Sequence, residues 1–253
     1  MAILHYIHRL HQILLFYTLL LWLGSMLLLG NVLALPLFAA PRALREPLVQ
    51  GGISLICRVF LEGAQACGIM RLDLQALDAL NGRGRLLLVP NHPSMIDAFL
   101  VLSRVRRAIC LMKASIGGNL FLGAGARLAG YVSNRHPGLM FRQAIDRVEK
   151  GNLLMIFPEG TRTVRLPVND FQGSAALIAK KAGAPLQTVL ITTNSAYLSK
   201  GWKIWRPPAF PMIYRAVPGE VFDADDNLEI TSAKLQRYFE SAVPRPIDPA
   251  MKL

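Results

Sequence analysis

The distribution of apolar residues divides the chain into two parts. From Gln12 to Pro41 no residue is charged, and Ile13–Leu35 is almost wholly apolar. A run of this length reaches the ~20 residues that a helix needs to cross a bilayer. The pattern predicts a membrane anchor. A secretory signal peptide is the competing interpretation, but the apolar core is too long and its small-residue cleavage pattern is poor. Hydropathy alone does not distinguish a helix that spans the membrane from one that enters a single leaflet.

A second helix is predicted over residues 53–70, where polar residues repeat at helical spacing within a wide apolar face. The polar positions are Ser54, Arg58, Glu62 and Gln65. Such a helix either packs on the core or lies in the membrane interface beside the anchor. Either way, residues 1–75 form a membrane-associated helical module, and a second domain is expected over 76–253.

In the second domain, short apolar runs alternate with helical stretches. The predicted strands cover 85–90, 108–112, 130–133, 152–157, 186–192 and 212–217. The predicted helices cover 95–104, 137–150, 173–183 and 231–242. This alternation predicts an α/β fold with a layered mixed sheet flanked by helices.

The first candidate site follows the apolar run Arg85–Pro90. That run predicts a buried strand, and Asn91–Ser94 predicts a tight connection into a helix capped by Ser94. Asp97, in the first helical turn, would then accept a hydrogen bond from one ring nitrogen of His92. The other nitrogen is left neutral and able to take a proton from an alcohol. A purely structural hydrogen bond is the alternative, but open α/β sheets bind ligands at the carboxyl ends of their strands.

The second candidate site follows another apolar run, at 151–157. Gly160 permits a close backbone approach, Thr161 offers a hydroxyl, and Arg162 supplies a planar two-pronged donor for phosphate oxygens. On its own this segment is equally typical of a solvated turn. Two such loops, each at the end of an apolar strand, favour a functional site over a pair of solvated turns.

Together the two loops resemble the signature of the glycerolipid acyltransferases, whose best-known members are the 1-acyl-glycerol-3-phosphate acyltransferases. The family's Asn-His-x-Ser-x-x-Asp pattern is matched by Asn91, His92, Ser94 and Asp97, and its Phe-Pro-Glu-Gly-Thr-Arg block by Phe157–Arg162. Further matches are Lys113, the block Gly130–Arg135, Phe171, Gly173, Ala179, Gly183 and Pro185. The resemblance covers roughly residues 80–195 in the right order.

The resemblance implies acyl transfer from an acyl thioester to the free hydroxyl of a lysophospholipid, most of all 1-acyl-glycerol-3-phosphate, which gives phosphatidic acid. His92 would be the general base and Asp97 would orient it. The expected substrate-binding residues are Asn91, Ser94, Lys113, Arg135, Glu159, Gly160, Thr161 and Arg162. The donor would be acyl-CoA or acyl carrier protein, and no metal or organic cofactor is implied.

Composition agrees with a protein that works at a lipid surface. The chain has 28 Lys and Arg against 16 Asp and Glu, a formal charge of +12, and 53% hydrophobic residues. An excess of basic residues is typical of proteins that bind nucleic acid, an anionic membrane or an acidic protein. No nucleic-acid motif accompanies it here. Three cysteines without metal-ligand spacing or a paired framework fit a reducing compartment. We therefore expect no nucleic-acid partner, an anionic inner (cytoplasmic) membrane, and a catalytic domain that faces the cytoplasm, where thioester donors are found.

Two departures from the family pattern leave alternatives open. Gln172 stands where many lysophosphatidic acid enzymes carry a basic residue, and Thr188–Val189 stands where they often have Val-Pro. The acceptor is therefore either a lysophospholipid or an unusual lipid, such as one that contains an amino acid. A membrane-anchored lipid-binding protein without turnover is a further alternative, although such a protein has no need of an oriented base. A serine hydrolase built on Ser94 is disfavoured, because Gly-x-Ser-x-Gly is absent around it.

Overall fold

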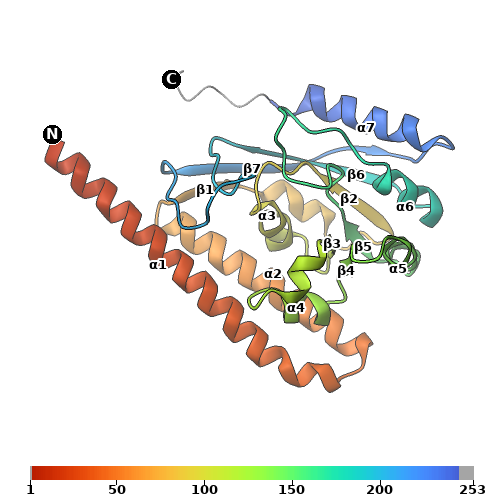
Figure 1. Cartoon of the computed structure of the whole chain (residues 1–253), viewed down its shortest axis with the longest axis horizontal. Helices are drawn as coiled ribbons and strands as arrows, with labels where there is room; N and C mark the ends of the chain where they lie inside the picture. Colours follow the sequence, from red (N-terminus) through yellow and green to blue (C-terminus); the bar gives the residue numbers. More distant parts are fainter. Residues whose placement is uncertain (1, 245–253) are drawn as a thin grey trace.

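Over residues 2–244, which the computed structural model describes, the chain forms a seven-stranded mixed sheet with helices on both faces (Figure 1). Residues 245–253, the end of the predicted second domain, lie outside that range. The strand order is β1-β7-β6-β2-β5-β3-β4. Neighbouring strands are parallel except for β6 and β7, which pair antiparallel. The predicted α/β fold with a layered mixed sheet is confirmed.

One strand of the sheet was not predicted. The strands are β1 (Met70–Asp73), β2 (Leu86–Pro90), β3 (Ile109–Met112), β4 (Val132–Ser133), β5 (Leu153–Met155), β6 (Leu186–Thr193) and β7 (Met212–Phe222). The missed strand, β1, lies within the range 1–75 that was assigned to the helical module. It has only four residues, and its place in the sheet comes from a distant partner, because Met70 pairs with Met212 of β7.

The helices after β2 follow the prediction with one addition. The helices are α1 (Ala2–Ala34), α2 (Arg42–Ala66), α3 (Asp97–Arg104), α4 (Gly123–Leu128), α5 (Pro137–Glu149), α6 (Ser174–Ala182) and α7 (Leu228–Ala242). Short 3-10 helices are η1 (Leu35–Ala39), η2 (Gln75–Leu80) and η3 (Ala114–Gly118). The addition is α4, whose six residues include two glycines, and glycine is a poor helix former.

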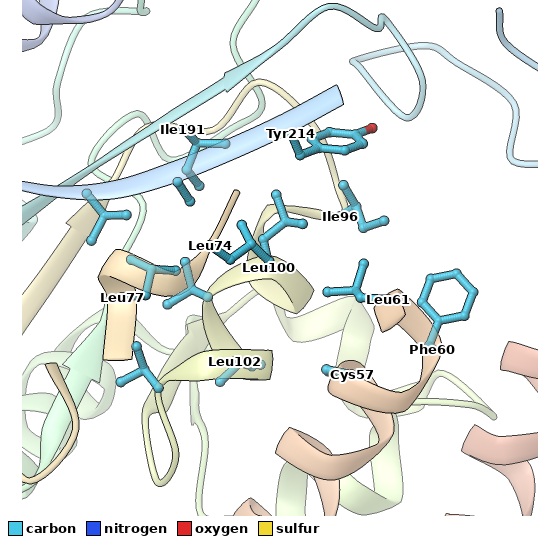
Figure 2. Packing of buried hydrophobic residues seen from close by; sticks show 14 of the residues in the cluster. Cys57, Phe60, Leu61, Leu74, Leu77, Ile96, Leu100, Leu102, Ile191 and Tyr214 are labelled. Carbon is cyan, nitrogen blue, oxygen red and sulfur yellow. The ribbon is translucent and has the colours of Figure 1, made fainter. Parts of the chain in front are cut away.

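Alternate side chains of β2 serve two different cores, one on each face of the sheet. Leu86 and Leu88 pack in a cluster with residues of α1, α2 and α3. Leu87 and Val89 pack in a second cluster with residues of α5, α6 and α7. Figure 2 shows part of the first cluster, where side chains of α2, η2, α3 and the sheet meet. A strand buried on both faces explains why the sequence of β2 is continuously apolar.

The amino-terminal helix is part of the folded protein. In Figure 1, α1 lies beside α2 along one flank of the domain. Phe16 and Leu19 are 3% and 7% exposed and belong to the first core cluster. Trp22 packs so closely on Gly63 of α2 that a Cβ added there would lie 2.5 Å from its ring. These contacts favour an anchor over a cleaved signal peptide.

The described residues contain one helical segment that is long and apolar enough to cross a membrane. It covers Tyr6–Ala39. Its most apolar stretch of 18 residues has a mean hydropathy of 2.2, and only 11% of that stretch is buried. Most of the apolar surface of α1 therefore faces away from the protein.

Of the polar stripe predicted on the second helix, Ser54 and Arg58 face the domain, whereas Glu62 and Gln65 are exposed. Ser54 is buried, and Arg58 Nε donates to the carbonyl oxygen of Ser103 in α3 at 3.2 Å. Leu48 and Leu55, on the apolar face of α2, are exposed. The helix thus packs on the core mainly through apolar residues, among them Cys57, Phe60 and Leu61, and leaves other apolar residues uncovered.

An ion pair ties α2 to α5 across the domain. Arg147 donates from Nη1 and Nη2 to the two carboxylate oxygens of Glu46, at 2.5 and 2.9 Å. The Glu46 side chain is 12% exposed and that of Arg147 is 21% exposed. Gly130, with φ +74°, lies against this carboxylate, and an added Cβ would lie 2.7 Å from Glu46 Cδ. The close approach requires glycine at this position.

We expect Glu46→Ala to lower the free energy of unfolding by about 2 kcal/mol, because it leaves a mostly buried guanidinium without its partner. Denaturant unfolding in detergent measures this. The matched control is Lys150→Ala, just after α5, which removes an exposed pair with Asp146 and should cost less than ~1 kcal/mol. Equal effects of the two substitutions would contradict a structural role for the Glu46–Arg147 pair.

Candidate active site

The four loops that carry the predicted site residues leave the sheet at one edge. The strands β2, β5, β3 and β4 are consecutive neighbours and parallel, so their carboxyl ends point the same way. His92 follows β2, Gly160 follows β5, Lys113 follows β3 and Arg135 follows β4. Strands lie ~4.8 Å apart, so the ends of β3 and β4 lie roughly 10 and 14 Å from the end of β2. This edge is where open α/β sheets bind ligands.

The structure forms the predicted hydrogen bond between His92 and Asp97. His92 Nδ1 and Asp97 Oδ2 are 2.9 Å apart, and the carboxylate is fully buried while the imidazole is 17% exposed. The ring of Phe157 stacks on the imidazole, with centroids 3.9 Å apart and planes 19° apart. With Nδ1–H donating to the carboxylate, Nε2 is the unprotonated nitrogen of the neutral ring, as a general base requires.

The helix that carries Asp97 begins differently from the prediction. Ser94 was expected to cap it, but α3 starts at Asp97, and its N-cap residue Ile96 makes no capping bond with its side chain. Instead, Ser94 Oγ donates to the carbonyl oxygen of Tyr197 at 2.8 Å. The backbone N–H of Ser94 donates to Asp97 Oδ2 at 2.7 Å. The prediction failed because the partner of Ser94 is far away in the sequence.

Burial dominates the electrostatics of Asp97. It raises the pKa of this carboxyl from 3.8 to about 6, although the hydrogen bonds from His92 and from the backbone of Ser94 act in the opposite direction. Among the described residues, Asp97 Oδ1 has no hydrogen-bond partner. One carboxylate oxygen is therefore buried without compensation, which explains why the charged form is disfavoured.

A second buried carboxylate, Glu159, joins the two motif loops. Its Oε1 accepts from the backbone N–H of His92 and from Thr163 Oγ1, both at 2.8 Å. Its Oε2 accepts from the backbone N–H of Asn169 at 2.9 Å. A further bond runs from the Thr163 N–H to the His92 carbonyl at 2.7 Å. The backbone of the base is thus held on both sides by the loop that follows β5.

Three residues of the expected substrate-binding set are buried and bonded within the protein. Asn91, Ser94 and Glu159 are each at most 2% exposed. The side-chain amide of Asn91 pairs with the backbone of Ile191 in β6, through Nδ2 to the carbonyl at 2.8 Å and from the N–H to Oδ1 at 2.7 Å. Because these side chains are buried and bonded within the protein, they hold the loops in position.

The glycine of the second loop is covered by Gln172. Gly160 has φ +64°, and a Cβ added there would lie 2.5 Å from Gln172 Nε2. The backbone N–H of Gln172 donates to the carbonyl of Pro158 at 2.8 Å, which places the side chain over the turn. Thr161, next in the loop, is partly exposed. The positive φ favours glycine at this position, and a Cβ added there would displace the Gln172 side chain.

Arg162, predicted to bind phosphate, also makes contacts within the protein. Its Nη1 donates to the carbonyls of Leu198 and Ser199 at 2.8 and 2.9 Å. Leu198 has φ +59°, a left-handed conformation that is uncommon for a residue other than glycine. Lys113 and Arg135, the other two predicted cations, are exposed at the ends of β3 and β4.

The sequence did not point to several residues of this site. Thr163 and Asn169 follow the second motif closely, and polar residues in a loop that must be buried are a signal that could have found them. The Tyr197–Ser199 segment offers no such signal, because its contacts are carbonyl oxygens in a loop between β6 and β7. Phe157 lies within the motif, but its stacking on the imidazole is visible only in the structure.

We expect Glu159→Gln to lower kcat by roughly one to two orders of magnitude, because a shift of a catalytic group by about 1 Å can cost about 10²-fold. An amide has one acceptor oxygen, so either the His92 and Thr163 donors or the Asn169 donor would face an NH₂ group. The free energy of unfolding should fall by about 1–3 kcal/mol for the same reason. The control is Asp170→Asn, at a position whose side chain is 75% exposed. Unchanged kcat in a folded Glu159→Gln protein would contradict the bridging role.

Comparisons with known proteins agree with this geometry. A model of the acyltransferase family matches residues 71–192, which include both motif loops. A search of curated proteins gives no match. Among solved structures, the chain is similar to the crystal structure of the 1-acyl-sn-glycerophosphate (LPA) acyltransferase PlsC from Thermotoga maritima, with a TM-score of 0.68 and 21% identity, over 93% of this chain and 95% of that chain. At this identity the likeness shows a shared fold. The family model includes both motif loops, and on this match the chain is assigned to the acyltransferase family.

Proposed function

We propose that this acyltransferase moves a fatty acyl group from acyl-CoA or acyl carrier protein to the free hydroxyl of 1-acyl-glycerol-3-phosphate, giving phosphatidic acid. The observation that carries the proposal is the His92–Asp97 hydrogen bond of 2.9 Å at the sheet edge, beside a glycine turn that ends in arginine. PlsC from Thermotoga maritima, whose fold this chain shares, is an LPA acyltransferase, and this supports the same acceptor. A binding protein without turnover would have no use for a base held by a buried carboxylate.

The chemistry needs one proton carrier. His92 Nε2 takes the proton of the acceptor hydroxyl as the hydroxyl oxygen attacks the thioester carbonyl carbon. Asp97 stabilises the imidazolium that forms. Collapse of the tetrahedral intermediate breaks the C–S bond and releases the thiolate, which takes the proton from the imidazolium. The new ester and the free thiol leave, and the base returns to its neutral form.

The phosphate of the acceptor would bind beside the glycine turn. Arg162 keeps Nη2 and Nε for this contact, because its hydrogen bonds to the carbonyls of Leu198 and Ser199 both come from Nη1. Thr161 adds a hydroxyl, and the positive φ of Gly160 lets the turn form beneath the Gln172 side chain. The flexible side chain of Lys113 can reach toward the same phosphate from a strand end roughly 10 Å away. Arg135, one strand further out, would contact an outer part of the headgroup or the donor.

The acceptor headgroup is the finer part of this proposal. Gln172 covers Gly160 with a neutral amide, which would suit a hydroxyl or phosphodiester headgroup as well as a phosphate monoester. The test is to supply the purified protein with acyl-CoA and with acyl carrier protein, each with monoester, phosphodiester and amino-acid-containing lysolipids, and to identify the products by mass spectrometry. Phosphatidic acid as the main product supports the proposed acceptor, and acylation of another headgroup alone overturns it.

The membrane would be the cytoplasmic one, with the catalytic domain on the cytoplasmic side, where both donors are found. α1 contacts the domain from Phe16 to Asn31, which donates from Nδ2 to the carbonyls of Leu120 and Phe121 at 2.9 Å each. These contacts cover about 22 Å of helix at 1.5 Å per residue. A helix that packs on the domain over that length cannot also cross the ~30 Å hydrocarbon core. We therefore place α1 in one leaflet, with its exposed apolar side in the lipid.

We expect His92→Ala to lower kcat by roughly 10²–10⁴-fold, the usual cost of a lost general base. The protein should remain folded and membrane-bound, because the imidazole is not part of either core cluster. His136→Ala is the control, since His136 is an exposed histidine after β4. Near-normal turnover in a folded His92→Ala protein would rule out the mechanism.

We expect kcat/KM to rise with pH through about 6, because the carboxyl of Asp97, with its pKa raised to about 6, must be ionised to stabilise the imidazolium. Below that pH the protonated pair cannot act as a base. The measurement is a pH–rate profile from about pH 4.5 to 8.5 with vesicles of constant composition and concentration. In Asp97→Asn the overall rate should be severely reduced, and the rise of kcat/KM should move away from pH 6. A wild-type profile that is flat between about pH 5 and 7.5 would contradict the assignment.

A further inference from the structure

The connection between β6 and β7 forms a folded segment with its own internal bonds. This segment, Asn194–Pro211, is called the β6–β7 segment. Tyr197 Oη donates to the carbonyl of Ile204 at 3.1 Å, and Trp202 Nε1 donates to the carbonyl of Arg206 at 2.9 Å. The guanidinium of Arg206 also lies 4.7 Å from the centre of the Trp202 ring. The segment is therefore held in one conformation by contacts between its own residues.

On its inner side, the β6–β7 segment holds both motif loops. The Tyr197 carbonyl accepts from Ser94 Oγ at 2.8 Å. The Leu198 carbonyl accepts from the Met95 N–H at 3.0 Å and from Arg162 Nη1 at 2.8 Å. One carbonyl thus receives donors from the loop of the base and from the loop of the proposed phosphate site. The left-handed backbone at Leu198 turns two successive carbonyls toward these donors.

On its other side, the same segment contacts the membrane helix. The ring of Phe16 in α1 lies edge-on to that of Tyr197, with centroids 5.5 Å apart. Tyr17 Oη donates to the carbonyl of Trp205 at 3.1 Å. Tyr197 is only 2% exposed because it is enclosed between α1 and the segment. A single residue therefore contacts α1 with its ring and the active-site loop with its carbonyl.

The outer surface of the β6–β7 segment is cationic and aromatic. Lys200, Lys203 and Arg206 are exposed, and the sequence from 194 to 211 contains no acidic residue. Trp205 is 62% exposed and Ile204 is 43% exposed. Lys203 Nζ lies 5.9 Å from the centre of the Trp205 ring. Tryptophan and lysine together are the residues that anchor proteins at the headgroup level of a membrane.

We propose that the β6–β7 segment is a second membrane contact, that it selects an anionic lipid surface, and that it transmits this contact to the catalytic loops through Tyr197. This inference rests on the proposed function at a membrane. An acidic carrier protein would also suit the three cations. The lipid surface is the better partner because Trp205 and Ile204 are apolar, and because the bond from Tyr17 places them beside the exposed apolar side of α1.

The test compares two triple variants of the full chain, each of which removes two cations and one large apolar side chain. The segment variant is Lys200→Gln/Lys203→Gln/Trp205→Ala. The control variant removes two exposed cations and an exposed isoleucine from α6 and α7, as Lys181→Gln/Arg237→Gln/Ile230→Ala. Both lose two positive charges. Flotation with neutral phosphatidylcholine vesicles and with vesicles that contain phosphatidylglycerol measures membrane affinity. Acyl transfer at saturating vesicles measures kcat.

We expect the segment variant to lose affinity for anionic vesicles by roughly 25-fold, or roughly fivefold per cation, and the control variant to bind like wild type. Anionic vesicles should raise the kcat of wild type and of the control above that in neutral vesicles. The segment variant should lose this increase even at saturation. Wild-type affinity of the segment variant for anionic vesicles, or recovery of the wild-type kcat at saturation, overturns the proposal.

A separate variant tests the transmission step. Tyr197→Phe keeps the ring against Phe16 and the carbonyl against Ser94 but removes the bond to Ile204. It should lower kcat in anionic vesicles while vesicle affinity and the KM for acyl-CoA stay unchanged. An unchanged kcat overturns transmission through Tyr197.

The choice of acyl donor distinguishes a lipid surface from a carrier protein as the partner of the β6–β7 segment. If the segment variant is impaired only with acyl carrier protein and not with acyl-CoA, the surface binds the carrier protein and the proposal is overturned. If wild type acylates no lysolipid, the proposed function fails, whereas the flotation comparison still decides whether the segment contacts an anionic surface.

Discussion

The carboxylate of Glu159 is the contact on which the geometry of the active site depends. It receives two donors on one oxygen and one on the other, from the loop of the base and from its own loop. Without it, the buried N–H groups of His92 and Asn169 would have no acceptor, at a cost of about 1–3 kcal/mol each. This bridge is possible because β2 and β5 are parallel neighbours, so their carboxyl ends lie only ~4.8 Å apart. The sheet topology brings the two loops together, and the carboxylate then fixes His92 relative to the turn at Gly160.

The two buried carboxylates of the site differ in how well they are compensated. Both oxygens of Glu159 accept hydrogen bonds, whereas Asp97 Oδ1 has no partner among the described residues. Folding raises the pKa of Asp97 from 3.8 to about 6, so between these values the folded state binds its proton more tightly than the unfolded chain does. The contribution of Asp97 to stability is therefore greatest below pH 3.8 and is lost as the pH rises through 6. In the proposed mechanism catalysis requires the ionised form, so the site would be active at a pH where Asp97 contributes least to stability. Such a conflict is typical of a functional position.

The parts of the structure that depend on local pattern were predictable from the sequence. The strands β2 and β5, the loops that follow them and the His92–Asp97 hydrogen bond come from short-range rules about apolar runs, turns and spacing. The parts that depend on distant partners were not. β1 has four residues and forms because it pairs with β7, which lies far away in the sequence. Ser94 looked like a helix cap, because nothing local reveals that the Tyr197 carbonyl competes for its hydroxyl. The hydrogen bonds of Asn91 and Glu159 could not be predicted for the same reason, since their backbone partners lie far away in the sequence.

The polar residues of α1 show how a lipid substrate could meet the base. Asn31 is a costly residue for an otherwise apolar helix, and its side chain bonds to the carbonyls of Leu120 and Phe121 and to the N–H of Gly125. These residues belong to the chain that follows β3, at the catalytic edge of the sheet. At the middle of α1, Phe16 reaches the same edge through Tyr197. α1 therefore runs along the edge at which the strands end, and its exposed apolar side lies in the leaflet in the arrangement proposed above. A lysolipid in that leaflet would present its hydroxyl and phosphate at the depth of His92 while its acyl chain stays in the hydrocarbon, so transfer would not require the acceptor to leave the membrane.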